Sequence, residues 1–311
     1  MEAAPFFRDV ADAVPEACAF WTRAPDGARL RLAELGRGAR GTVLLFPGRT
    51  ECVEKYGPTG RALAARGYGT LAIDWQGQGL SDRFSPDPET GHVERFDDYQ
   101  RDVAAMLEAA RARGLPRPWH LLAHSMGGAI GLRALLSGLP VASAVFSGPM
   151  WGIALPPLMR PAAWTLTTLA SPFGLRHRPP PTVPRGVYLL EAPFAGNLLT
   201  TDRDTYAWMQ AQVRAHPELG LGGPSLGWVG AALEEVRALA RAPSPDLPCL
   251  CVCGENERIV DLAAIRARMA RWPKGRLVIE PGAEHEVLME RAEIRDRTLD
   301  AAAALFDAQA A

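Results

Sequence analysis

The feature that most constrains the fold is an alternation of short, mostly apolar runs with segments of helical spacing. The run at 41–46 is almost uninterrupted, as suits a strand covered on both faces in a parallel sheet. Further runs at 69–74, 119–123 and 141–146 are separated by helical patterns at 56–66, 96–113 and 126–136. Strands that alternate with helices predict an α/β fold, a mostly parallel sheet with helices on both faces.

The first forty residues show a different pattern. The segments 19–23 and 28–35 are β-prone and flank the turn signal Pro25-Asp26-Gly27. This arrangement predicts an antiparallel start to the sheet.

The alternation stops between residues 151 and 242, in a stretch rich in proline, tryptophan and glycine. It resumes with strand patterns at 249–253 and 276–279, and a last helix is expected at 294–306. We therefore predict a core made of residues 1–150 and 243–311, with residues 151–242 inserted as a cap over the sheet.

Charge and hydropathy narrow the function classes. The net charge is −1, so no global field favours nucleic acid or an anionic surface. The N-terminal residues lack the apolar run of a signal peptide, and no charge-free apolar stretch reaches the roughly 20 residues needed to cross a bilayer. We expect a soluble, cytoplasmic protein, and a transient contact with the inner membrane surface stays open. The sequence does not define the oligomeric state.

Three of the five cysteines, Cys249, Cys251 and Cys253, alternate within one predicted strand. Their thiols would share one face and point the same way, so they would not converge easily on a metal. Because free cysteine is among the most buried residue types, we interpret them as core residues.

The strongest candidate for a catalytic site is the segment 121–129, Leu-Leu-Ala-His-Ser-Met-Gly-Gly-Ala. It lies where a strand ends and a helix begins, and a sharp turn there would lift the side chain of Ser125 over the sheet. Ala123 takes the first glycine position of the usual Gly-x-Ser-x-Gly signature and is small enough for the turn, while Gly127 holds the last. We predict Ser125 as the nucleophile, at the sheet edge where ligands of α/β proteins bind.

A serine hydroxyl needs a base that a third group orients, and in this fold the chain order is serine, acid, histidine. Of the histidines after Ser125, His177 and His216 fall in the predicted cap. His285 instead follows the strand at 277–280 and precedes the last helix. We therefore predict His285 as the base.

The acid is expected on the loop after residues 249–253, which offers Glu255, Glu257 and Asp261. Asp261 is better placed as the N-cap of a helix that begins at Leu262. Glu257 is favoured, and from the residues alone Glu255 stays open.

Two backbone N–H groups would complete the site as an oxyanion hole. One belongs to Met126, directly after the nucleophile, and the other to Arg49, in the loop after the first parallel strand. In this role Arg49 acts through its main chain, so its side chain is free for another one.

The predicted cap supplies candidates for substrate binding. Trp151 could line an acyl pocket, although aromatic residues at such spacing are usually core. Arg160 and Arg178, with Arg176 and Arg185, could meet a phosphate, although for any single one a solvated position is the more ordinary interpretation.

Several segments resemble bacterial PldB-type lysophospholipases, which belong with the monoglyceride lipases among the α/β hydrolases. The segments that carry the resemblance are 46–51, Lys55-Tyr56, 74–79, 91–93, 96–99, 123–128, 193–194, 222–224, 257–261 and 282–286. The resemblance implies Ser125 as nucleophile, His285 as base and Glu257 as acid. One departure from the wider superfamily is Gln76, where arginine is common.

We therefore expect a serine hydrolase that releases a fatty acid from a lysophospholipid, without a metal or organic cofactor. A monoacylglycerol lipase or a general carboxylesterase is the nearest alternative. A prolyl-type aminopeptidase, an acyltransferase and an inactive binding protein on the same scaffold are further alternatives.

Overall fold

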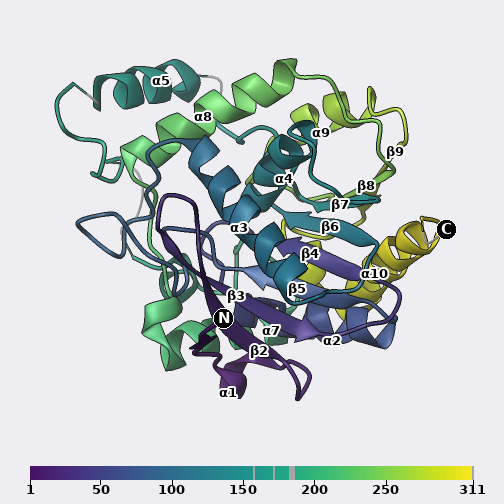
Figure 1. Ribbon diagram of the computed structural model, residues 1–311. Coiled ribbons are helices and arrows are strands. Elements are labelled where there is room, and N and C mark those ends of the chain that lie inside the picture. Colours follow the sequence, from purple (N-terminus) through teal and green to yellow (C-terminus); the bar gives the residue numbers. More distant parts are fainter. Residues whose placement is uncertain (157, 171, 182–185, 310–311) are drawn as a thin grey trace.

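A single nine-stranded sheet organises the computed structural model, which describes residues 1–156, 158–170, 172–181 and 186–309 (Figure 1). The strand order is β1-β2-β3-β5-β4-β6-β7-β8-β9. The first three strands and the β3–β5 pair are antiparallel, and all pairs from β5 to β9 are parallel. This mostly parallel sheet confirms the predicted α/β class.

The strands of the sheet are short and mostly buried. They are β1 (Ala3–Ala4), β2 (Cys18–Arg23), β3 (Arg29–Gly36), β4 (Thr42–Phe46), β5 (Gly69–Ile73), β6 (Trp119–His124), β7 (Ala144–Ser147), β8 (Cys249–Gly254) and β9 (Gly275–Glu280). Successive residues of β4 serve opposite faces, because Leu44 and Phe46 join one apolar cluster while Val43 and Leu45 join the other. Both faces of the central strands are therefore core.

Helices cover the two faces. The helices of the core are α1 (Arg8–Ala11), α2 (Gly57–Ala65), α3 (Tyr99–Ala112), α4 (Met126–Leu136), α9 (Leu262–Met269) and α10 (Ala292–Asp307). In Figure 1, α3, α4 and α9 lie above the sheet and α2 and α10 below it. The side chain of Asp261 accepts the N–H groups of Ala263 and Ala264, which confirms the predicted N-cap of α9.

The described part of the segment between β7 and β8 contains the α-helices α5 (Met159–Ala170), α6 (Tyr188–Glu191), α7 (Arg203–Ala215) and α8 (Leu226–Arg241), and the 3-10 helix η3 (Pro217–Leu219). They do not form one separate layer. Helix α8 carries α5 on its outer side and contributes Trp228, Ala232 and Leu239 to the main core cluster. Helix α7 packs against α1 instead, where Trp208 and Gln212 donate to the carbonyl of Val10.

The three alternating cysteines of β8 lie in the core, as their pattern predicted. All three are 2% exposed or less, and the sulfur atoms of Cys251 and Cys253 are 3.9 Å apart on one face. Among the described residues, no helix is both long enough and apolar enough to span a bilayer.

Candidate active site

The predicted site residues follow strands that end at one edge of the sheet. Arg49 comes after β4, Ser125 after β6, Glu257 after β8 and His285 after β9, and these strands are parallel. The chain leaves β4 toward β5 on one side, and β6 lies on its other side. This reversal of strand order is the position at which open α/β sheets bind their ligands.

Ser125 occupies a strained turn between β6 and α4. Its φ of 49° and ψ of −116° fall in a region that residues with a Cβ rarely adopt. The turn is held by its main chain, because the N–H of Ser125 donates to Ser147 and its carbonyl accepts from Gly128 and Met150. Ser125 is partly exposed, while its neighbours along the chain are buried.

The start of α4 packs tightly on the end of β4. A Cβ added to Gly127 would lie 2.1 Å from the carbonyl oxygen of Phe46 and 2.5 Å from that of Pro47, closer than any side chain permits. This contact sets the turn at Ser125 directly against the loop that carries Arg49. Within the described chain, neither the N–H of Arg49 nor that of Met126 donates a hydrogen bond to a protein acceptor, so both amides are free for another acceptor.

His285 and Glu257 form a buried pair. Nδ1 of His285 donates to Oε2 of Glu257 at 2.6 Å, and the two side chains are 4% and 0% exposed. The other carboxylate oxygen of Glu257 accepts the N–H groups of Ile259 and Val260. Burial by itself raises the pKa of Glu257, but the hydrogen bond from His285 outweighs it with the help of the two amides, so the pKa is lowered.

His124 lies between the turn at Ser125 and this pair. The ring centroids of His124 and His285 are 4.8 Å apart, and Nδ1 of His124 donates to the carbonyl of Ser147 at 2.9 Å. Burial lowers the pKa of His124 to about 3, so the ring is neutral. In the part of the chain that is described, no hydrogen bond joins Ser125 to His285, a separation that is common in enzymes without substrate.

Glu51 clamps the loop that carries Arg49. Its carboxylate accepts the N–H of Gly48, the hydroxyl of Tyr56 at 2.6 Å and Nζ of Lys55 at 2.7 Å. Burial raises the pKa of Glu51, but Lys55 and His124 outweigh it and lower the pKa to about 2. In the sequence, Glu51 and Lys55 belong to segments that carry the family resemblance, but the sequence assigned neither residue a role.

Lys55 also lies 2.6 Å from Glu286, the residue after the predicted base. Burial raises the pKa of Glu286, and Lys55 only partly offsets this effect. One buried ammonium group therefore ties the loop after β4 to the loop that carries His285.

The loop that carries His285 is also bonded to the inserted segment. The N–H of His285 donates to the carbonyl of Leu198 at 3.3 Å, and that of Glu286 to the carbonyl of Leu199 at 2.8 Å. Two main-chain bonds thus join the predicted base to the middle of residues 151–242.

The cap residues proposed for substrate binding lie in different environments. Trp151 is 3% exposed, packs against Phe146 and Trp272, and donates its indole N–H to Gly128. These contacts make it a buried residue of the core. Arg160 is exposed and pairs with Asp261 at 3.3 Å, and Arg178 is exposed. Arg185 lies outside the described residues.

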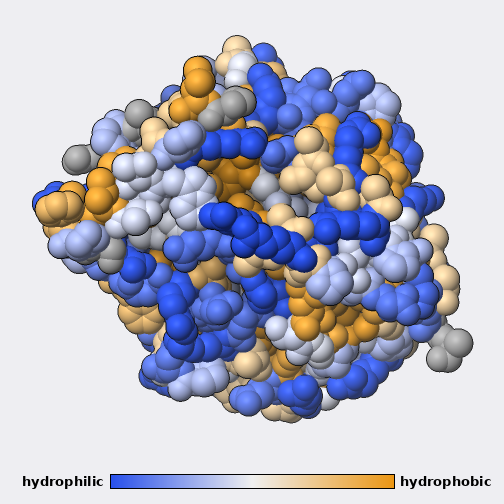
Figure 2. Space-filling model, turned by 90° about the horizontal axis from the view of Figure 1, so that it is seen from above, coloured by the Kyte–Doolittle hydropathy of each residue, from blue (hydrophilic) through white to orange (hydrophobic). Residues whose placement is uncertain are grey.

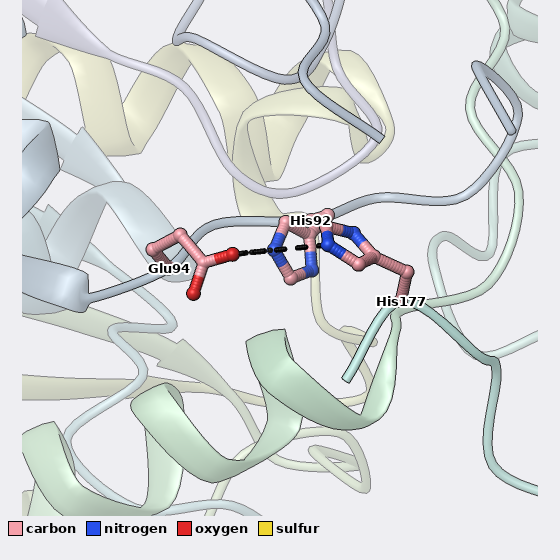
Figure 3. A group of neighbouring side chains, drawn as sticks. All are labelled: His92, Glu94 and His177. Atoms are coloured by element: carbon pink, nitrogen blue, oxygen red, sulfur yellow. Dashed lines mark hydrogen bonds and ion pairs between the residues drawn. The ribbon is translucent and has the colours of Figure 1, made fainter. Parts of the chain in front are cut away.

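Among the described residues, two groups of side chains have donor sets that could hold a metal. His92, Glu94 and His177 form the first (Figure 3). Nε2 of His92 donates to Glu94 at 3.0 Å while its Nδ1 faces the hydroxyl of Ser225, and Arg176 pairs with the second oxygen of Glu94. Glu51, His124 and Glu286 form the second group, in which Lys55 contacts both carboxylates. Because Arg176 pairs with the acid of the first group and Lys55 contacts both acids of the second, we read them as structural links.

Fold and site together define an α/β hydrolase, with a strained serine at the switch point of the sheet and a His–Glu pair beside it. The chain belongs to the family described as serine aminopeptidase, S33, which matches residues 37–292.

Named relatives agree with this class. Lysophospholipase L2 of Escherichia coli (strain K12) is 33% identical over 276 residues, which cover 85% of this chain and 80% of the relative. The probable lysophospholipase L2 of Haemophilus influenzae is 32% identical over 262 residues, covering 84% and 82%. A soluble variant of monoglyceride lipase from Saccharomyces cerevisiae has the same fold, with a TM-score of 0.73, 21% identity and coverage of 98% and 99%.

Proposed function

We propose that this chain is a serine carboxylic-ester hydrolase that releases a fatty acid from a lysophospholipid. The observation that carries the proposal is the buried 2.6 Å pair of His285 and Glu257 at the sheet edge where Ser125 sits on its strained turn. The names of the relatives at 32–33% identity support a single-chain phospholipid as substrate.

In the proposed mechanism the hydroxyl of Ser125 attacks the acyl carbonyl, and Nε2 of His285 takes its proton. Glu257 fixes the tautomer through Nδ1 and stabilises the imidazolium that forms. The free amides of Arg49 and Met126 donate hydrogen bonds to the developing oxyanion, and the positive end of α4 adds to this stabilisation. His285 then protonates the leaving alcohol and activates water, which releases the fatty acid.

Replacing the nucleophile tests the proposal. Ser125→Ala should lower the hydrolysis of a lysophospholipid by several orders of magnitude and abolish labelling by a fluorophosphonate. Ser137→Ala, at the exposed far end of α4, is the matched control and should keep both. Hydrolysis that survives in Ser125→Ala would contradict the assignment.

The preferred headgroup is tested by measuring fatty-acid release from a lysophospholipid and from a monoacylglycerol of equal chain length, side by side. Faster turnover of the lysophospholipid supports the proposal. Faster turnover of the monoacylglycerol keeps the chemistry and moves the enzyme to neutral lipids.

A peptidase is the second candidate, because the family description names a serine aminopeptidase. The same three side chains can cleave an amide. Release of an aminoacyl anilide without release of a fatty acid would favour this alternative.

We further propose that residues 151–242 act as a cap that touches lipid at the cytoplasmic side of the inner membrane. Of the ten large apolar side chains that are exposed in the described residues, eight lie between Leu158 and Leu190, including Leu158 at 93% and Phe173 at 71%. Figure 2, seen from above toward the α5 and α8 side, shows apolar patches between polar ones.

Binding to vesicles tests this contact. Leu158→Ser with Phe173→Ser should weaken sedimentation with phosphatidylglycerol vesicles that contain a lysophospholipid. Phe84→Ser, which changes an exposed phenylalanine outside the cap, should not. Equal binding by both variants would remove the contact from the proposal.

A further inference from the structure

The side chain of Arg49 lies in an unusual environment. Arg49 follows β4 by three residues, and its guanidinium reaches under the inserted segment, where Nη2 donates to the carbonyl of Gly222. The guanidinium carbon lies 5.3 Å from the ring centroid of Trp228, on α8. Gly91 also lies beside the guanidinium, because a Cβ added there would lie 2.8 Å from Nη2. The guanidinium is therefore enclosed by the loop at 91, the loop at 222 and the face of an indole ring.

This buried cation has no acidic partner among the described residues. Its Nε is buried and makes no hydrogen bond, and the only nearby ionisable group is the phenol of Tyr99, which is neutral at physiological pH. Burial lowers the pKa of Arg49 to about 10, which leaves it charged at neutral pH. An unpaired buried charge is costly, and proteins retain such groups mainly where a ligand supplies the counter-charge.

The cap arginines differ from Arg49 in this respect. Arg176 pairs with Glu94 at 3.1 Å and Arg160 with Asp261 at 3.3 Å. Arg178 is exposed, so water already solvates its charge.

We propose that the guanidinium of Arg49 binds the phosphate of the substrate and thereby selects single-chain lipid esters with a phosphate over neutral ones. This inference rests on the lipid-ester hydrolysis proposed above and assigns its headgroup contact.

The position of Arg49 suits this role. Its main-chain amide is one of the two expected to hold the oxyanion, so its guanidinium belongs to a residue that is expected to contact the reacting ester. A guanidinium offers several N–H donors in one plane, which match phosphate oxygens better than an ammonium does. The residue as a whole is partly exposed to solvent, while its Nε is buried.

The primary test is the ratio of kcat/KM for a lysophosphatidylcholine to that for a monoacylglycerol of equal chain length. Arg49→Gln should lower this ratio about 10- to 100-fold, mainly through the KM of the phosphate ester, as expected for one charge-assisted contact. Arg49→Lys keeps the charge without the planar donors and should give an intermediate ratio. Arg237→Gln is the matched control, since Arg237 also lies over a tryptophan, Trp164, at 5.6 Å but is exposed; its ratio should equal that of the wild type.

A second measurement needs no stable variant. In the wild type, a single-chain alkyl phosphate should inhibit at least about tenfold more strongly than the alkanol of the same length. Inorganic phosphate at millimolar concentration should not relieve the inhibition by the alkyl phosphate. If inorganic phosphate does relieve the inhibition, the guanidinium is a site for free phosphate, and the assignment of Arg49 to the substrate headgroup is overturned.

Equal losses on both substrates in Arg49→Gln would also overturn the inference, because they indicate that the side chain only supports its loop. Binding of the alkyl phosphate to Ser125→Ala separates this inference from the proposed function. If neither ester is hydrolysed by the wild type, the proposed function fails. The phosphate site would still be supported if Ser125→Ala bound the alkyl phosphate more tightly than the alkanol and the double variant Ser125→Ala with Arg49→Gln did not.

Discussion

The Cα of Gly148 faces the His285–Glu257 pair so closely that a Cβ there would lie 3.1 Å from Nδ1 of His285 and 3.2 Å from Oε2 of Glu257. Gly148 directly follows β7 and has a φ of 47°. Its lack of a side chain therefore leaves room for the hydrogen bond that orients the predicted base.

Gly148→Ala should for this reason lower kcat at least about tenfold, because a small displacement of the base is costly to catalysis. Gly138→Ala is the matched control, since Gly138 has a φ of 88° and nothing within 4 Å of the added Cβ. Both variants should lose about 1 kcal/mol of stability from the left-handed backbone, measured by urea denaturation. Only Gly148→Ala should lose activity, and equal activities would refute the packing argument.

Glu257→Gln should lower kcat about 10³- to 10⁴-fold with little change in KM, because the amide no longer stabilises the imidazolium. Glu255→Gln separates the two acids that the sequence left open. Glu255 is exposed, and among the described residues its carboxylate accepts only the N–H of Gly282, at 3.0 Å. The kcat of Glu255→Gln should therefore remain within about twofold of the wild-type value. The reverse order of the two kcat values would assign the acid to Glu255.

Ser125→Gly should be more stable than Ser125→Ala by about 1 kcal/mol or more, since glycine relieves the positive φ that alanine retains. Thermal unfolding of the two inactive variants gives the difference. Equal stabilities would mean that the turn holds no strain.

Glu51→Gln should destabilise the protein at pH 7 by about 3 kcal/mol, because it removes a buried partner of Lys55. Glu286→Gln should cost less than half as much, because the pKa of Glu286 is raised and its charged form is the less favoured one. Urea denaturation of the two variants checks the order, and a larger loss in Glu286→Gln would contradict it.

The lowered pKa of Glu51 makes the free energy of unfolding depend on pH. The pKa of Glu51 is lowered in the folded protein from 4.5 to about 2, so the unfolded chain takes up the proton first as pH falls. Its stabilising contribution is complete above pH 4.5 and disappears as pH falls toward 2. The stability difference between wild type and Glu51→Gln should therefore shrink over this window. A difference that stays constant would contradict the lowered pKa.

Local patterns predicted much of the core. The helix expected at 126–136 matches α4, and the strand expected at 249–253 matches β8 to within a residue. These elements carry strong apolar runs and clear boundary residues. The strand expected to begin at 141 begins at Ala144, because the preceding residues turn after Leu139.

The inserted segment was predicted less well. Helices α7 and α8 each begin with an N-cap, Asp202 and Ser225, whose side chains accept main-chain N–H groups. Those signals were present in the sequence, but the many prolines and glycines around them concealed the periodicity. The environment of the Arg49 side chain could not be predicted, since its partner Gly222 is 173 residues away along the chain.

The bonds from His285 and Glu286 to Leu198 and Leu199 restrict how substrate can enter. A rigid movement of residues 151–242 away from the sheet would break these two bonds or displace His285, the predicted base, together with the inserted segment. Helix α5 makes neither of these bonds and packs on α8, so we predict that substitutions on α5 change the entry of a fatty chain without moving His285. We therefore expect lipid entry and proton transfer by His285 to respond to substitutions in different parts of the inserted segment.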